Sequence, residues 1–256
     1  MTTAMTSDPA FHRALAGVVS GVLGAPVRIG AVREDAPGPR GESVWCSMYD
    51  RRMGNGFGGA SPNEEAIVSE IRRRMAERTT PLLVAFDGRS GSGKSTLASR
   101  VAARVAGRVV EGDDFHAGGT DADWDRRTVA EKVADCIDWR RLRIEAIEPL
   151  RSGRNAAWRP FNFETGVGLA AHTVGCGPAA VIVLDGAYSS RPVLADLLDL
   201  PVLVEASNEA VRRQRLIARE GADFMARWHA LWDAAEEYYF THVRPRSSFD
   251  MVVISD

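Results

Sequence analysis

"LLVAFDGRSGSGKSTLASRVAARV", the stretch from Leu82 to Val105, joins a strand pattern to a helix pattern through a glycine-rich turn. The strand pattern ends at Asp87 and the helix pattern begins at Gly93. The turn, from Gly88 to Ser95, satisfies G-x-x-x-x-G-K-[ST]. Its glycines let the backbone curl so that N–H groups point at phosphate oxygens, and the helix N-terminus adds a partial positive charge. The stretch therefore predicts a cradle for a nucleoside triphosphate.

The residue types inside this cradle predict ATP and Mg²⁺ as cofactors. The side chain of Lys94 is expected to reach the β- and γ-phosphates, and the hydroxyl of Ser95 to ligate Mg²⁺. A chance Gly/Ser-rich turn is the alternative, and the flanking strand and helix patterns argue against it. The residues predicted to contact the phosphates are Gly88, Ser90, Gly91, Ser92, Gly93, Lys94, Ser95 and Thr96.

Short, mostly apolar runs alternate with helical patterns over the rest of the chain. The predicted strands are "LLVAFD" from Leu82, "RVVEG" from Arg108, "VIVLDG" from Val181, "VLVEAS" from Val202 and "MVVIS" from Met251. Helical patterns follow Gly93, Asp138, Arg191, Asn208 and Asp223. Apolar strands separated by helices form parallel sheets covered on both faces. We therefore predict an α/β P-loop fold with an open, five-stranded parallel sheet, whose ligands bind beyond the carboxyl ends of the strands.

The chain divides near residue 60. Residues 1–60 predict a small α+β appendage, with a helix at about Phe11–Leu23 and two short strands separated by Gly/Pro-rich segments. Residues 61–256 form the predicted main domain. It opens with Ser61 as a helix N-cap, Pro62 at the first helical position and Glu64 closing a capping box. An apolar stripe follows, made of Ile67, Val68, Ile71 and Met75.

Composition limits the classes of protein that fit the sequence. The 256 residues carry a net charge of −2, with no conspicuously basic face or tail, so we expect no nucleic-acid partner. No apolar run reaches the roughly 18 residues of a membrane span. Three cysteines, far apart in the sequence, predict neither a disulfide framework nor a zinc site and favour a reducing cytoplasm. An export signal at Ala14–Val27 is the alternative, although no A-x-A-like site follows it.

Several P-loop classes lack their signatures here. The guanine-specifying N-K-x-D is absent, as is the transporter signature LSGGQ, and no second subdomain of an AAA+ module is evident. The sequence has instead "VVEGDDFHAGG" after the second predicted strand. At this point it resembles the uridine kinase, phosphoribulokinase and bacterial pantothenate kinase family of P-loop kinases. The resemblance spans about Pro81 to Ser255 and rests on "GRSGSGKST", "EGDDFH", "LDG" and "RRQRLIARE".

The resemblance implies a catalytic carboxylate at Asp113. In that family an aspartate after the second strand accepts the proton of the attacking hydroxyl, and phosphoryl transfer needs such an acceptor. Asp114 lies beside it. Two adjacent carboxylates also fit a helix cap or a solvated turn. His116 occupies the place of a tyrosine near the substrate in uridine kinases, and a structural role is the alternative.

Further residues on the acceptor side follow from the resemblance. Asp125, in "TDADWDRRT", matches an aspartate that holds ribose hydroxyls in uridine kinases, or it caps the next helix. The segment "WRPFNFETG" resembles a substrate-side segment of the family. In it Phe161 and Phe163 are candidates for stacking on a base and Arg159 for contacting the acceptor, the alternative being a small aromatic core.

The resemblance also implies residues around Mg²⁺ and the triphosphate. Asp185 takes the place of a second acidic group near Mg²⁺, where uridine kinases usually have glutamate. Arginines at i, i+3 and i+7 predict a helix over the triphosphate, with Arg215 and Arg219 stabilising the developing charge. An exposed basic face paired with Glu209 and Glu220 is the alternative. Whether Arg212 and Arg213 share this role stays open, and Arg89 has no predicted partner.

The aromatic stripe Phe224, Trp228 and Trp232 predicts core, and Glu236 and Glu237 are expected to be solvated. Together these features predict a cytoplasmic P-loop kinase that transfers the γ-phosphoryl group of ATP to a hydroxyl of a nucleoside-like small molecule. Pantothenate, a sugar phosphate or an antibiotic is the alternative acceptor. A regulatory protein that only binds ATP and a slow ATPase that drives assembly of a partner are rivals. A homodimer is compatible with the sequence, which does not settle the oligomeric state.

Overall fold

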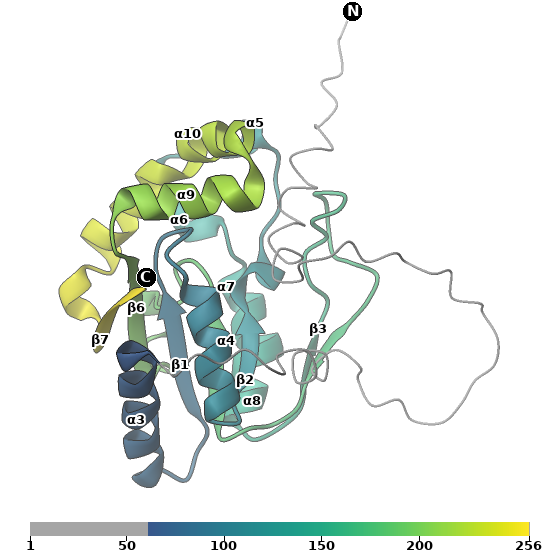
Figure 1. Ribbon diagram of the computed structural model, residues 1–256. Coiled ribbons are helices and arrows are strands. Elements are labelled where there is room, and N and C mark those ends of the chain that lie inside the picture. Colours follow the sequence, from purple (N-terminus) through teal and green to yellow (C-terminus); the bar gives the residue numbers. More distant parts are fainter. Residues whose placement is uncertain (1–60, 256) are drawn as a thin grey trace, which may run out of the picture.

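A computed structural model of the protein describes residues 61–255, apart from the side chains at positions 220, 224 and 225. Its centre is a five-stranded, wholly parallel sheet with the order β2-β5-β1-β6-β7 (Figure 1). All five strands were predicted from the sequence, and the predicted fold is confirmed. The predicted elements of residues 1–60 lie outside the described residues.

The strands and helices have the following bounds. The sheet strands are β1 (Leu82–Asp87), β2 (Arg108–Glu111), β5 (Val181–Asp185), β6 (Leu200–Ala206) and β7 (Met251–Ser255). The long helices are α3 (Pro62–Ala76), α4 (Lys94–Arg104), α9 (Glu209–Glu220) and α10 (Ala222–Tyr238). Shorter helices are α5 (Asp121–Asp125), α6 (Val129–Asp135), α7 (Trp139–Arg141) and α8 (Glu148–Arg151). Two π-helical turns cover Leu142–Ile147 and Tyr239–Val243, and 3-10 turns cover Gly112–Phe115, Pro192–Leu194 and Arg246–Ser248.

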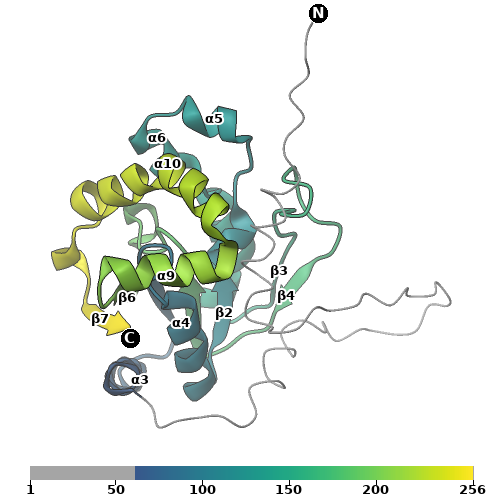
Figure 2. The ribbon, with the colours of Figure 1, turned by 45° about the horizontal axis from the view of Figure 1, so that its top comes forward.

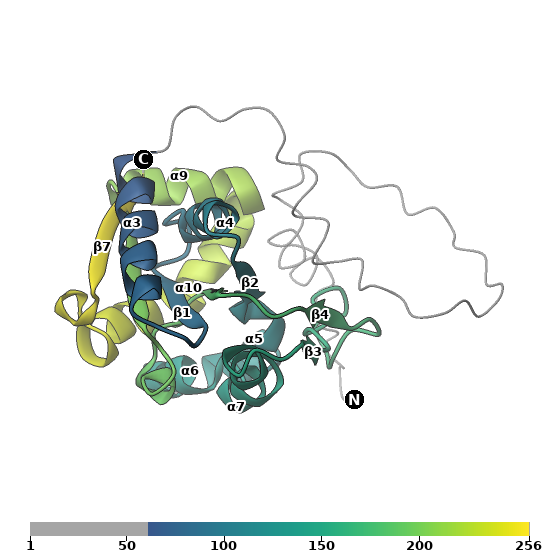
Figure 3. The same cartoon turned by 90° about the horizontal axis from the view of Figure 1, so that it is seen from below.

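The sheet is the middle of three layers (Figure 3). Because side chains alternate along a strand, each strand supplies both faces. Leu82, Val84 and Phe86 of β1 pack with α3 and α4 in one cluster. Leu83 and Ala85 pack in the other cluster, with residues of α6 to α8 and α10. The polar residues at the ends of the strands follow the same alternation. Their position in the strand therefore determines on which face of the sheet each side chain lies.

Three details differ from the sequence predictions. Ser61 caps α3 as expected, but the buried carboxylate of Glu64 pairs with Arg100 at 2.7 Å instead of closing a capping box. After Arg191 there is a single 3-10 turn and no longer helix, because the chain returns to the sheet after nine residues. An antiparallel hairpin of β3 (Ala156–Trp158) and β4 (Val174–Cys176) was not predicted at all.

The two tryptophans of the predicted aromatic stripe behave as expected. Trp232 is buried in the core and Trp228 packs against it, with their ring centroids 5.9 Å apart. Trp232 also contacts Trp124 of α5, so α10 joins the core of the α6 to α8 face. No helix within residues 61–255 is long and apolar enough to cross a membrane.

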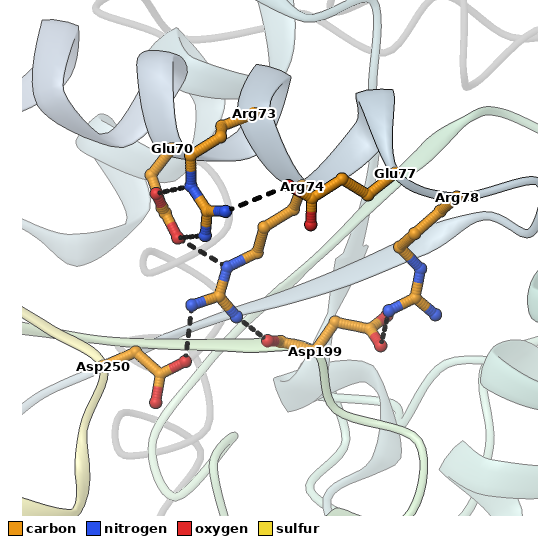
Figure 4. A network of polar contacts seen from close by, with 7 residues as sticks. All are labelled: Glu70, Arg73, Arg74, Glu77, Arg78, Asp199 and Asp250. Carbon is orange, nitrogen blue, oxygen red and sulfur yellow. Dashed lines mark hydrogen bonds and ion pairs between the residues drawn. The ribbon is translucent and has the colours of Figure 1, made fainter.

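Asp199, at the amino end of the sheet, ties α3 and the segment that follows it to the strands, because its backbone carbonyl accepts a bond from Arg74 and its carboxylate pairs with Arg78 (Figure 4). Asp199 accepts a hydrogen bond from the backbone N–H of Leu83 at 2.8 Å. It also pairs with Arg78 at 2.5 Å and with Arg151. The network around it contains Glu70, Arg73, Arg74, Glu77, Arg78, Asp199 and Asp250. The side chain of Asp199 is 10% exposed, so its charge is partly shielded from water and its contacts should be stronger than those of exposed pairs such as Arg73 with Glu77.

Replacing Asp199 by Asn should therefore destabilise the protein. The amide keeps one acceptor but loses the charge on which Arg78 and Arg151 depend, and we expect the free energy of unfolding to fall by about 1–3 kcal/mol. Chemical denaturation would measure the loss. Asp196→Asn is the matched control, since Asp196 pairs with Arg143 in an exposed position, where about 0–1 kcal/mol is expected. Equal losses in the two variants would contradict the assigned role of Asp199.

Candidate active site

The predicted phosphate cradle from Gly88 to Ser95, called the P-loop from here on, lies at the carboxyl end of β1 and leads into α4. Close packing against neighbouring elements requires glycines in this loop. Gly88 has φ +151°, and a Cβ there would lie 2.3 Å from the carbonyl oxygen of Val204. Gly91 has φ +78°, and a Cβ there would lie 2.8 Å from the carbonyl oxygen of Arg212. Side chains at these positions would collide with backbone atoms of β6 and α9. The glycine-rich motif thus allows the loop to pack tightly as well as to curl.

Asp87, the last residue of β1, holds the base of the P-loop. It is fully buried, on the α10 side of the sheet. Its carboxylate accepts hydrogen bonds from the backbone N–H groups of Gly88 (2.8 Å), Tyr188 (3.0 Å) and Ser190 (3.0 Å), and from the hydroxyl of Tyr239 (2.7 Å). Burial raises the pKa of Asp87, and the hydrogen bonds from Tyr239, Ser190 and Gly88 together with the charge of Lys94 oppose that shift by stabilising the charged form. One carboxylate thus joins the P-loop, the loop after β5 and the C-terminal π-helical turn.

The C-terminal end of α10 holds the next residues of the loop. The backbone N–H of Ser90 donates to the buried carboxylate of Glu236 at 2.9 Å. Arg89 pairs with Glu237, and its guanidinium lies 5.7 Å from the centroid of the Phe240 ring. Glu237 and Phe240 are thus the partners of Arg89, for which the sequence predicted none. The prediction that Glu236 is solvated was wrong, because it is the acceptor for a P-loop amide; Glu237 is exposed but paired.

The predicted arginine helix is α9, which crosses above the carboxyl end of the sheet (Figure 2). Arg212 is buried and donates to the carbonyl of Ser90 at 3.0 Å while pairing with Glu209 at 2.8 Å. Arg215 is half-buried and donates to the carbonyl of Ser92 at 3.4 Å and to the hydroxyl of Ser255 at 2.9 Å. Arg219 is exposed, and its charge partly opposes the rise in the pKa of Asp113 that burial causes. Arg213 is exposed too.

Four carboxylates gather where β2 and β5 end. Glu111 and Asp185 are paired residues of the two strands, and Asp113 and Asp114 follow in the 3-10 turn after β2. Burial raises the pKa of Asp185 to about 6, and Lys94 and Ser95 oppose the shift. Burial also raises the pKa of Asp113, opposed by Lys94 and Arg219. Glu111 has a pKa well above its ordinary value because of burial and the neighbouring Asp185.

The predicted metal ligands fit a hard divalent cation. Asp185 is 3% exposed, and its Oδ1 atom has no hydrogen-bond partner among the described residues. The hydroxyl of Ser95 lies close enough to this carboxyl group to oppose the rise in its pKa that burial causes. Within residues 61–255 no group of three or more His, Cys, Asp or Glu side chains is arranged to hold a metal by itself. Mg²⁺ in kinases typically uses one or two carboxylates together with phosphate oxygens and water, so this donor set fits it.

The predicted acceptor side adjoins the turn that carries Asp113 and Asp114. The indole N–H of Trp158 donates to the carboxylate of Asp114 at 2.7 Å, and the backbone N–H of Phe161 donates to its carbonyl at 2.7 Å. Burial raises the pKa of Asp114 to about 6, and the bond from Trp158 opposes this. Within the described residues the carboxylate of Asp113 accepts no such bond, which distinguishes the two neighbours. Asp114 binds the hairpin through Trp158 and Phe161, whereas Asp113 lies within electrostatic range of Lys94 and Arg219.

The remaining acceptor candidates occupy different environments. His116 accepts a hydrogen bond from the N–H of Gly118 at 2.9 Å and packs on Phe161, with ring centroids 4.9 Å apart. Phe161 is buried and Phe163 half-buried against it, as the small aromatic core predicts. Arg159 donates to the carbonyl of Ala170 at 2.7 Å and so braces the hairpin loop. Their roles in binding an acceptor stay predictions.

Asp125 lies exposed at the end of α5, and the alternative sequence interpretation for it was wrong. It does not cap the next helix, because Thr128 is the N-cap of α6 and forms a capping box with Glu131. A role of Asp125 in holding hydroxyl groups stays a prediction. Trp124, beside it, packs on His116 with ring centroids 5.8 Å apart, which places α5 next to the aromatic group.

Comparison with solved structures finds the same fold in two proteins that are described as kinases. A Bacillus stearothermophilus protein described as a "possible uridine kinase" superposes with a TM-score of 0.50 at 20% sequence identity, covering 73% of this chain and 98% of its own. A "putative fructose transport system kinase" from Silicibacter sp. TM1040 gives a TM-score of 0.56 at 20% identity, covering 76% and 100%. No family model matches the sequence, and no curated protein matches it. The resemblance noted in the sequence is therefore matched by the fold.

The role of Asp87 can be tested by replacing it with Asn. The amide N–H₂ group would face at least one of the four hydrogen-bond donors, so the P-loop should lose its anchor. We expect the free energy of unfolding to fall by about 2–4 kcal/mol and the dissociation constant for ATP to rise at least about tenfold, which corresponds to roughly 1.4 kcal/mol. Calorimetry would measure both quantities. Asp223→Asn, at an exposed position of α10, is the control. An unchanged ATP affinity would refute the anchoring role.

Proposed function

We propose that the protein is an ATP-dependent kinase that transfers the γ-phosphoryl group to a hydroxyl of a small, nucleoside-like molecule. The observation that carries the proposal is the environment of Asp113. Its carboxylate interacts with Lys94 of the P-loop and with Arg219 of α9. A proton acceptor therefore lies within electrostatic range of a phosphate-binding cation and of a second cation, beyond the carboxyl ends of the strands, where ligands of such sheets bind. This is the set of groups that phosphoryl transfer requires.

The proposed reaction needs no covalent enzyme intermediate. The acceptor oxygen forms a bond to the γ-phosphorus, the bond from that phosphorus to the β–γ bridging oxygen breaks, and ADP leaves. Asp113 takes the proton of the acceptor hydroxyl. Lys94, the P-loop amides and Arg219 hold the charge that develops on the transferred group. Mg²⁺, when bound near Ser95 and Asp185, would neutralise phosphate charge, so positioning and electrostatics account for catalysis.

The nucleoside-like acceptor is supported by the motifs around Asp113 and by the likeness in fold to the possible uridine kinase. The likeness to a fructose transport system kinase shows that the fold alone does not select the acceptor. Nucleosides, sugars, sugar phosphates, pantothenate and hydroxylated antibiotics therefore belong in one panel of acceptors. ATP consumption with Mg²⁺ across that panel tests the proposal directly.

Asp113→Asn separates a kinase from a protein that only binds ATP. The amide cannot take the proton, so acceptor-dependent turnover should fall by about 10²- to 10⁴-fold. The dissociation constant for ATP should stay within about threefold, because the P-loop and its anchors are intact. Asp196→Asn, at an exposed position near Arg143, should leave both quantities unchanged. ATP binding with no acceptor-dependent turnover across the panel would favour the regulatory alternative.

The pH dependence of turnover offers a second test. Asp113 acts as a base only when ionised, and its pKa lies above the ordinary value of 3.8 because of burial. Turnover should therefore fall as the pH is lowered, with the midpoint of the acidic limb above 3.8. The residual turnover of Asp113→Asn should lack this limb. A limb that persists in the variant would assign it to another group, such as Asp185, whose pKa is about 6.

A further inference from the structure

The strand β2 ends in Glu111, a carboxylate to which the sequence motifs assign no role. Glu111 is paired with Asp185 in the parallel register between β2 and β5. Val109 and Val183, two residues earlier on each strand, are also paired, and both pack in the cluster that contains α4. Because side chains alternate along a strand, Glu111 and Asp185 lie on this same face of the sheet.

The face matters because α4 begins there with the P-loop residues Lys94 and Ser95. Paired residues of neighbouring parallel strands are side by side, at the roughly 5 Å spacing of the strands. Asp185 interacts with Glu111, with Ser95 and with the charge of Lys94. The two carboxyl groups therefore lie next to each other and next to the hydroxyl predicted to ligate the metal.

Contacts within the protein leave this pair incompletely satisfied. Asp185 is buried, yet its Oδ1 atom has no hydrogen-bond partner among residues 61–255. A buried polar atom of this kind is costly unless something pairs with it. Asp87 shows the contrast, since its carboxylate at the end of β1 is satisfied by four donors. An unpaired oxygen beside a second carboxylate and a hydroxyl is a donor set suited to a small, hard cation.

We infer that Glu111 joins Asp185 and Ser95 in holding the divalent cation. In this arrangement the longer side chain of Glu111 brings a second carboxylate to the cation, which the shorter side chain of Asp185 approaches less closely. It acts either by direct ligation or through a water that ligates the metal, and both predict loss of metal affinity when its charge is removed. The inference rests on the proposed function only for the triphosphate that completes the site.

Mn²⁺ serves as the probe, because it takes the same oxygen ligands as Mg²⁺ and is detected directly by electron paramagnetic resonance. The full-length chain would be titrated with Mn²⁺ in the presence of ATP, and separately with ATP in metal-free buffer. Wild type, Glu111→Gln and Asp185→Asn would be compared. Glu77→Gln is the matched control, since Glu77 ends α3 near the opposite end of the sheet and is exposed. Thermal unfolding without metal would confirm that each variant folds.

Glu111→Gln should weaken Mn²⁺ binding in the ATP complex by about 10- to 100-fold. Metal-free ATP affinity should stay the same or increase, since a negative charge near the triphosphate is removed. The melting temperature without metal should not fall in this variant, because removing one of two adjacent carboxylates relieves the repulsion between them. Should Glu111→Gln fail to fold, Glu111→Asp takes its place, with a smaller loss of Mn²⁺ affinity expected.

Two results would overturn the inference. One is Mn²⁺ affinity within about twofold of wild type in Glu111→Gln, with Asp185→Asn impaired. The other is a loss of metal-free ATP affinity in Glu111→Gln that is as large as its loss of Mn²⁺ affinity. Such a result would mean that Glu111 maintains the structure of the P-loop and does not hold the metal. If the wild-type protein binds ATP but no Mn²⁺, the inference about the metal fails, while the assignment of the P-loop as a phosphate-binding site is upheld. If wild type binds no ATP, the proposed function itself fails.

Discussion

The candidate active site depends on one buried group, the carboxylate of Asp87. A charged group inside the core is costly unless its oxygens are satisfied, and here three backbone N–H groups and the Tyr239 hydroxyl satisfy them. Those donors come from the P-loop, the loop after β5 and the C-terminal π-helical turn. The C-terminal part of the chain is thus built into the support of the phosphate cradle, although 152 residues separate Tyr239 from Asp87.

The alternation of side chains along a strand divides the site between the two faces of the sheet. Asp87 continues the series of Leu83 and Ala85 and lies on the α10 side, where its partners shield it from water. Asp185 and Glu111 continue the series of Val183 and Val109 and lie on the α4 side. A shift of one residue in the register of one of these strands would turn its terminal carboxylate to the opposite face of the sheet. The anchor of the P-loop and the proposed metal site are therefore set by the same register.

Local patterns carried the sequence predictions that succeeded. The five strands and the P-loop are contiguous segments, each with its own periodicity or motif, and so they were predictable. The hairpin of β3 and β4 was missed because three-residue strands leave too short a pattern. Contacts such as Glu236 with Ser90 join residues far apart in the sequence, which no local pattern encodes. Asp87 and Glu111 share a sequence feature with Asp185, a carboxylate at the carboxyl end of a predicted strand, but the resemblance assigned a role only to Asp185.

The arginines of α9 show how one helical repeat produces different roles. Arg212, Arg215 and Arg219 share a face by spacing, yet their exposure increases along the helix. The first two donate to the carbonyls of Ser90 and Ser92, so they hold the backbone of the P-loop. Arg219 lies one turn further on, where its charge reaches Asp113. Because backbone carbonyls already accept hydrogen bonds from Arg212 and Arg215, Arg219 is the arginine to which we assign the charge that develops on the transferred phosphoryl group.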